Sequence, residues 1–226
     1  MARGVRRGAS ADLKRTVLSD QIKDYIIRAI LDGEFESGDR VVESALARDL
    51  GVSQAPVREA IRDLTVLGFL ETENYKGASV RSFTPEELNE VYTVRAALES
   101  LAARLASLRA TEEDLAGLRV TLDKMIEAGR ERDLDLMTRL DNDFHETLLK
   151  ISGNKLLHQL WKRLQFGYWT IVTAKMSSFD LEYLATRHAE LLAAGASGDP
   201  VRATEAMRHH LEDLGKPLQT SEAEDG

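Results

Sequence analysis

The sequence contains no cysteine, and this absence narrows the chemistry open to the protein. Without thiols there are no disulfides and no thiolate zinc sites, so a transition metal must be held by His, Asp or Glu side chains. The sequence also lacks any run of about 18 apolar residues. Its charged N-terminal segment MARGVRRGASADLKR has no apolar stretch of the kind that a signal peptide needs. We therefore expect a cytoplasmic protein with no membrane partner.

Positive and negative charges are distributed unevenly along the chain. Residues 1–81 contain 13 Lys or Arg and 13 Asp or Glu, whereas residues 82–226 contain 17 and 25 and account for the whole net charge of −8. All five histidines also lie in the second part. This asymmetry predicts two domains with different chemistry.

A helix-turn-helix pattern followed by a hairpin occupies residues 16–82, after a flexible basic tail over residues 1–15. The stretch TVLSDQIKDYIIRAILDG has the apolar period of a helix, and Gly51 separates the short helix ESALARDL from a third helix that Pro56 opens. The strand-like pieces FLETE and ASVRSF flank NYKG, which suits a tight turn. The hairpin is expected to form a wing.

The third helix is expected to enter the major groove of DNA with its N-terminal residues facing base edges. Gln54 suits adenine, Arg58 suits guanine or a phosphate, and Arg62 lies one turn further along toward the DNA backbone. The alternative is that both arginines only form solvated pairs with Glu59 and Asp63. The predicted DNA-binding residues are Ser53, Gln54, Ala55, Arg58, Arg62, and Lys76 and Gly77 in the wing.

The run DGEFESGDRVVESALARDLGVSQAPVREAIRDLTVLGFLETENYKGASV resembles the N-terminal domain of the GntR family of bacterial regulators. The LGVS-x-x-PVREA core is the most specific part of this similarity. The resemblance implies a winged helix that binds a short inverted repeat of operator DNA as a homodimer. Many members of the family have Arg after GVS where this chain has Gln54, so the operator preference is expected to differ.

Residues 84–216 are expected to form an antiparallel all-α bundle of about six helices, and residues 217–226 an acidic disordered tail. Thr84, Pro85 and Glu87 are typical of a helix start, with an N-cap, a proline in the first turn and a reciprocal glutamate. Further breaks are expected near residues 110, 131, 153, 177 and 198, and Asn154 is expected to cap a helix. The whole chain is therefore predicted to be mainly α-helical.

The strongest chemical pattern of the bundle is LDNDFHETLL. Asp141 and His145 are four residues apart, so they share one face of a helix and are placed to chelate one ion. That face is the apolar one, and a buried carboxylate needs a hydrogen-bonding partner or a cation.

His188 and His210 also fall on apolar stripes, on either side of the turn GASGDP. At a rise of about 1.5 Å per residue, the two imidazoles would be level in an antiparallel hairpin. His209 falls on a solvent face and His158 at the edge of its helix's apolar stripe, so both are expected at the surface or beside the ligands and not as ligands. One Asp and three His suit zinc, nickel, manganese or iron, although from spacing alone they equally suit separate core histidines satisfied by hydrogen bonds.

Arg95 is a second inward-facing charge, and a buried guanidinium requires an anion. Glu99, one helical turn later, would supply it as a structural pair.

The pattern VRAALE, DNDFH, SGN, RHAELL and MRHHL resembles the FCD effector domain of the FadR subfamily of GntR regulators. The resemblance implies that Asp141, His145, His188 and His210 bind a divalent metal, with zinc or nickel expected, and that Arg95 binds a small organic acid. A metabolite-responsive repressor is thus the predicted function. The alternatives are a metalloenzyme and a DNA-binding module with a purely structural metal.

Overall fold

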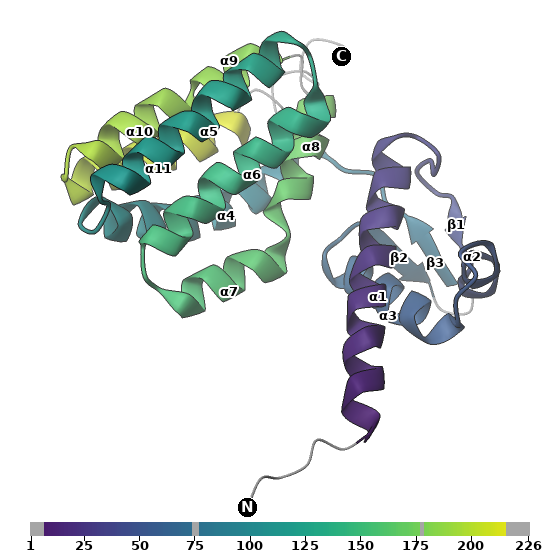
Figure 1. Ribbon diagram of the computed structural model, residues 1–226. Coiled ribbons are helices and arrows are strands. Elements are labelled where there is room, and N and C mark those ends of the chain that lie inside the picture. Colours follow the sequence, from purple (N-terminus) through teal and green to yellow (C-terminus); the bar gives the residue numbers. More distant parts are fainter. Residues whose placement is uncertain (1–6, 74–76, 177–178, 216–226) are drawn as a thin grey trace, which may run out of the picture. The chain divides into compact units, whose positions relative to one another are not determined.

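The computed structural model describes residues 7–73, 77–176 and 179–215 of the chain. It divides into two compact units, Met1–Ser82 and Phe83–Gly226, which are described separately (Figure 1). None of the helices in the described ranges is both long enough and apolar enough to cross a membrane.

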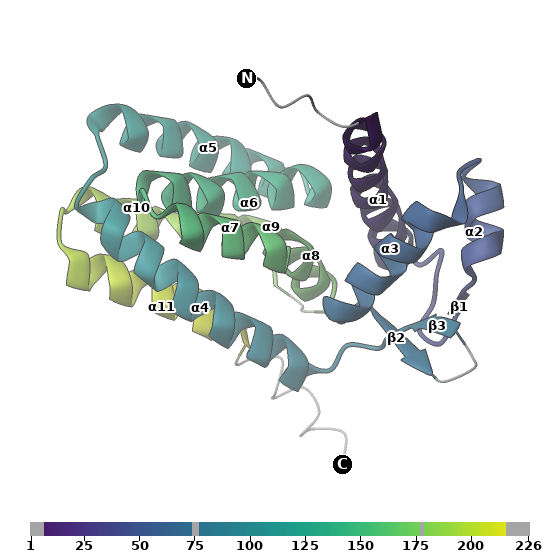
Figure 2. The same ribbon diagram turned by 90° about the horizontal axis from the view of Figure 1, so that it is seen from below.

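The first unit is a winged helix-turn-helix, as predicted. Helix α1 packs against α3, and the three short strands form an antiparallel sheet in the order β1-β3-β2 (Figure 2). Ile26, Val57, Leu64 and Phe69 are fully buried and form the core between helices and sheet. The elements are α1 (Arg7–Leu31), β1 (Arg40–Val41), α2 (Glu43–Asp49), α3 (Gln54–Val66), β2 (Leu70–Glu73) and β3 (Gly77–Val80).

Two features of this unit differ from the prediction. Helix α1 already begins at Arg7, so residues 7–15 are helical and not a flexible tail. This segment is rich in Ala, Leu, Lys and Arg, which favour a helix, and no glycine or proline follows Gly8 until Gly33. Strand β1 was not predicted, because two residues are too few to show an alternating pattern. Residues 1–6 and Lys76 lie outside the described residues.

The second unit is an antiparallel helical bundle. Helix α4 packs along α11, and α5 packs along α6 and α9 (Figures 1 and 2). The described residues form α4 (Pro85–Ser107), α5 (Glu112–Arg130), α6 (Leu134–Ile151), α7 (Lys155–Leu164), α8 (Phe166–Met176), α9 (Leu181–Thr186), α10 (His188–Ala196) and α11 (Pro200–Gly215). Residues 216–226, which include the predicted acidic tail, lie outside the described part.

The helix starts that were predicted from capping residues are confirmed. The Thr84 side chain accepts a hydrogen bond from the backbone N–H of Glu87, and the Glu87 carboxylate accepts one from the N–H of Thr84. The Asn154 side chain accepts from the N–H of Leu157 and so caps α7. These caps satisfy backbone donors that a helix cannot satisfy internally.

The bundle has more helices than the six expected, because two of the predicted helices are each divided. Gln165 adopts a left-handed conformation with φ of 55° and separates α7 from α8. Arg187 separates α9 from α10, so that His188 is the first residue of α10. Close packing fixes α9 in place: a Cβ atom on Gly129 of α5 would lie only 2.8 Å from the carbonyl oxygen of Leu181.

Candidate metal centre and DNA-binding helix

The N-terminal turn of α3 is exposed, as expected for a DNA-contacting helix. Ser53 is the N-cap residue, but its side chain makes no capping hydrogen bond. Gln54, Ala55, Arg58 and Arg62 are all exposed on the same helix. In the wing, Gly77 begins β3 with φ of 86°, a conformation that side chains other than glycine rarely adopt. The N-terminal end of α3, from its N-cap to its second turn, thus presents exposed hydroxyl, amide and guanidinium groups.

Arg58 forms an ion pair with Glu43 and not with Glu59, the partner that the alternative reading suggested. Its Nη2 lies 2.9 Å from Oε2 of Glu43 at the start of α2, which raises the pKa of the arginine through the hydrogen bond and the charge of that carboxylate. Asp63, the partner suggested for Arg62, is instead paired with Lys23 of α1 at 3.0 Å. Because the Arg58 side chain is 65% exposed, its pair with Glu43 contributes little to stability and leaves the arginine accessible.

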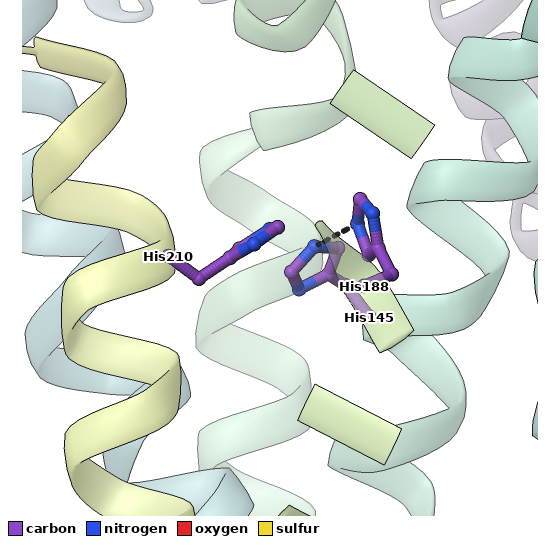
Figure 3. A group of neighbouring side chains, drawn as sticks. All are labelled: His145, His188 and His210. Carbon is purple, nitrogen blue, oxygen red and sulfur yellow. Dashed lines mark hydrogen bonds between the residues drawn. The ribbon is translucent and has the colours of Figure 1, made fainter. Parts of the chain in front are cut away.

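Three buried histidines converge in the bundle. His145 from α6, His188 from α10 and His210 from α11 point toward one another (Figure 3). One ring nitrogen of each lies within 4.8 Å of the other two. The Nε2 atoms of His145 and His188 are 3.2 Å apart, and the ring centroids of His188 and His210 are 4.4 Å apart. This arrangement is one that can hold a metal ion.

Asp141 lies beside two of these histidines. Its Oδ1 atom is 3.0 Å from Nε2 of His188 and 3.8 Å from Nε2 of His145. Ligand atoms about 2.1 Å from one ion are separated by roughly 3.0 to 3.4 Å in octahedral or tetrahedral geometry. The two nitrogens and the carboxylate oxygen therefore stand at distances close to those of ligands around one ion.

The ring proton of His188 is already committed to a backbone carbonyl. Nδ1 of His188 lies 3.1 Å from the carbonyl oxygen of Ala185, so this nitrogen must carry a proton. In a neutral ring Nε2 then has none, although it faces a carboxylate and another imidazole. Nδ1 of His145 contacts Oε2 of Glu99, the carboxylate–histidine arrangement that orients imidazoles toward metals.

The electrostatics favour neutral rings of His188 and His210 and ionised carboxylates here. Burial lowers the pKa of His188, although its hydrogen bond with Asp141 acts in the opposite direction. Burial also lowers the pKa of His210 to well below its usual value. Burial would raise the pKa of Asp141, but the hydrogen bond with His188 and the charge of Arg95 hold it well below the usual value. Neutral imidazole and carboxylate are the forms that bind metals.

Arg95 is buried in the bundle and only 2% exposed. Its Nε donates to Oε1 of Glu99 at 2.7 Å, its Nη1 donates to Thr170 at 2.9 Å, and its Nη2 is 3.7 Å from Oδ2 of Asp141. The structural pair with Glu99, one of the two readings open from the sequence, is therefore formed.

Trp161 completes the surroundings of this pair. Its indole Nε1 donates to Oε1 of Glu99 at 2.8 Å. Burial would raise the pKa of Glu99, but the charge of Arg95 and the contact with His145 lower it to about 2. Neither Trp161 nor Thr170 was predicted, because each is far in sequence from the residues that it contacts.

A small cavity adjoins the cluster. It has a volume of about 20 Å³ and is lined by Asp141, His188 and His210 together with Tyr92, Thr173 and Arg187. Arg187 and His210 also line a larger outer groove of about 370 Å³, whose wall includes Glu190 and the exposed His209. Arg187 was not predicted as a site residue, because it stands in a short break between two helices.

The two remaining histidines lie apart from the cluster, as expected. His209 is exposed, and its ring is close to Arg208 on the same helix. His158 is partly exposed and lies 2.8 Å from Glu146. The five histidines thus separate into three buried ones that converge and two that do not.

Comparisons with known proteins agree with this architecture. The model of the FCD domain matches residues 90–213, and that of the bacterial regulatory proteins of the gntR family matches residues 18–80. A relative from Paenarthrobacter nicotinovorans, described as the probable D-xylose utilization operon transcriptional repressor, is 32% identical over 204 residues, 89% of each chain. The Nta operon transcriptional regulator of Aminobacter aminovorans is 39% identical over 139 residues, 60% of this chain and 66% of that protein.

A solved structure shows the same fold. Escherichia coli McbR/YncC superposes with a TM-score of 0.71 at 21% identity, over 91% of this chain and 98% of that one. A winged helix joined to an all-α domain, together with these relatives, defines a DNA-binding transcription regulator and not an enzyme. The chain belongs to the GntR family of bacterial regulators, and its C-terminal unit is an FCD domain of the FadR type.

Proposed function

We propose that this regulator is a metabolite-responsive repressor whose C-terminal unit binds a divalent transition metal and a small carboxylate effector. Two similar proteins support the direction of regulation, since they are described as repressors of a D-xylose utilization operon and of a gluconate operon. The metal and the effector are inferred from the chemistry of the buried cluster.

One observation carries the metal proposal. A neutral His188 has a single ring proton, yet its Nδ1 faces a carbonyl oxygen and its Nε2 faces the carboxylate of Asp141. One proton cannot serve both contacts. A second proton is disfavoured because burial lowers the pKa of His188. Without a proton, Nε2 of His188 and the carboxylate of Asp141 would face each other as two acceptors. A metal ion between them removes this repulsion, because both groups can bind it.

The proposed ligands are Asp141, His145, His188 and His210, and zinc or nickel suits this set of nitrogen and oxygen donors. When bound, the ion supplies a Lewis-acidic centre that attracts a carboxylate. Arg95 and Glu99 support the ligands, since Arg95 contacts Asp141 and Glu99 contacts His145. Direct binding of an effector by Arg95 stays a prediction and requires the guanidinium to exchange one of its present partners.

A thermal-shift screen of the zinc-loaded protein against small carboxylates tests the sensor function. A ligand that prefers the native state raises the melting temperature by mass action. At least one carboxylate should raise it in the metal-loaded protein but not in the metal-free protein. A metal that stabilises the fold while no acid changes the melting temperature would indicate a purely structural ion.

For the first unit, we propose that two copies bind an inverted repeat through α3, because a single small winged helix buries too little surface for tight, specific binding. The proposed DNA contacts are Ser53, Gln54, Ala55, Arg58 and Arg62, with Lys76 and Gly77 in the wing.

The substitution Arg58→Ala should weaken operator binding by at least ~1 kcal/mol, as expected for the loss of one good base or phosphate contact. The matched variant Glu43→Gln keeps the arginine and removes the carboxylate that pairs with it, so it should bind operator DNA as tightly as the wild type or more tightly. Gel shifts at fixed salt concentration measure both. Equal affinities of the wild type and Arg58→Ala would contradict the assignment.

A further inference from the structure

Arg187 stands at the boundary between the small inner cavity and the outer groove. It directly precedes His188 in the break between α9 and α10, and it lines both spaces, as does His210. A molecule that moves from the outer groove toward the histidine cluster along this route passes Arg187 and His210.

The charge of Arg187 has no carboxylate partner among the described residues. Its Nη2 donates to the backbone carbonyl of His210 at 2.8 Å, and its side chain is partly buried. Arg95, by contrast, already has Glu99 at 2.7 Å and Asp141 at 3.7 Å. A partly buried guanidinium bound only to a neutral carbonyl remains able to take an anion, whereas one with two carboxylates beside it is compensated.

The sizes of the two spaces restrict how a ligand can lie. The inner cavity of about 20 Å³ admits little more than one water-sized group. The outer groove of about 370 Å³ accommodates a small organic molecule, and Thr186, Glu190 and His209 give it a polar wall. A carboxylic acid would therefore fit with its carboxylate at the boundary and its remaining part outside.

We propose that Arg187 is the residue that captures the carboxylate of the effector, at the boundary between the histidine cluster and the outer groove. The polar body of the ligand lies in that groove, and its carboxylate is shared between the guanidinium and the metal. A planar guanidinium and a Lewis-acidic ion both select carboxylate over neutral groups. This inference depends on the proposed metal site, so its test also measures the metal.

Sodium acetate is the probe, because it presents a carboxylate with almost nothing attached. Acetate is added in place of chloride, so that the ionic strength stays constant, to the zinc-loaded wild type, Arg187→Gln and Arg187→Lys. The melting temperature of each protein is measured during the titration. Arg202→Gln is the matched control, since it removes an exposed cation from α11 that lines neither space. Elemental analysis gives the zinc content of each protein, and circular dichroism shows that each is folded.

Loss of one charged hydrogen bond should weaken acetate binding about tenfold or more in Arg187→Gln. Arg187→Lys should keep part of the response and Arg202→Gln all of it, with equal zinc in all four proteins. Zinc-loaded Arg187→Gln that binds acetate like the wild type overturns the role of Arg187 and leaves the metal site standing. A zinc-loaded wild type whose melting temperature does not change with acetate likewise overturns the role of Arg187 and leaves the metal site standing. A wild type that binds no zinc overturns the proposed function itself.

Discussion

Replacing His188 with alanine should lower zinc affinity well beyond tenfold. The substitution removes one of four proposed ligands and leaves Asp141 without the imidazole that lies 3.0 Å from it. His210→Ala should have a similar effect, because its ring belongs to the same buried cluster. Competition between each metal-free variant and a chelator of known affinity measures the change.

His209→Ala is the matched control. It removes a neighbouring histidine on α11 that is exposed and lies outside the cluster, so zinc affinity should stay nearly that of the wild type. Equal zinc affinities of the His188, His209 and His210 variants would reject the site. The contrast matters because any histidine-rich protein binds some zinc weakly.

The second large effect is expected on stability. Arg95→Met should lower the free energy of unfolding of the metal-free helical unit by about 3 to 5 kcal/mol, because it leaves the carboxylates of Glu99 and Asp141 buried without their main cation. Both tryptophans, Trp161 and Trp169, lie in this unit, so their fluorescence during urea unfolding follows it specifically.

A second ion pair of nearly the same distance, but exposed, separates the effect of burial from the effect of distance. Arg130 forms an ion pair with Glu182 at 2.8 Å, nearly the same distance as the 2.7 Å between Arg95 and Glu99, but its side chain is 57% exposed. Arg130→Met should lower the free energy of unfolding far less than Arg95→Met does, because solvent screens an exposed ion pair. The double variant Arg95→Met/Glu99→Gln should recover part of the loss. Equal costs for the two arginines would show that Arg95 is not buried as described.

The helical period explains why much of the site was predictable. Asp141 and His145 share a face because four residues are close to one turn of a helix. His188 and His210 were expected at one level from the lengths of their helices, and their rings do lie together. Most of the winged helix was equally clear, since its glycines and Pro56 mark where several of its elements begin or end.

Partners that depend on tertiary packing were not predictable. The sequence suggested Glu59 for Arg58, but the fold places Glu43 of a different helix beside it. Whether Arg95 pairs with Glu99 or with a ligand carboxylate also depended on which helices surround it. Arg187 was not predicted, because the apolar period of the sequence does not show the helix break in which it lies. In each case the deciding contact joins residues from separate elements.

Zinc titration of the metal-free wild type tests the central claim most directly. We expect one ion per chain with tight binding at neutral pH. Burial lowers the pKa values of His188 and His210, so protons should compete with zinc only below pH 6.5, the ordinary pKa of histidine. As the pH decreases further, the zinc affinity should decrease as well. Weak binding at neutral pH, or a stoichiometry far below one ion per chain, would contradict the account.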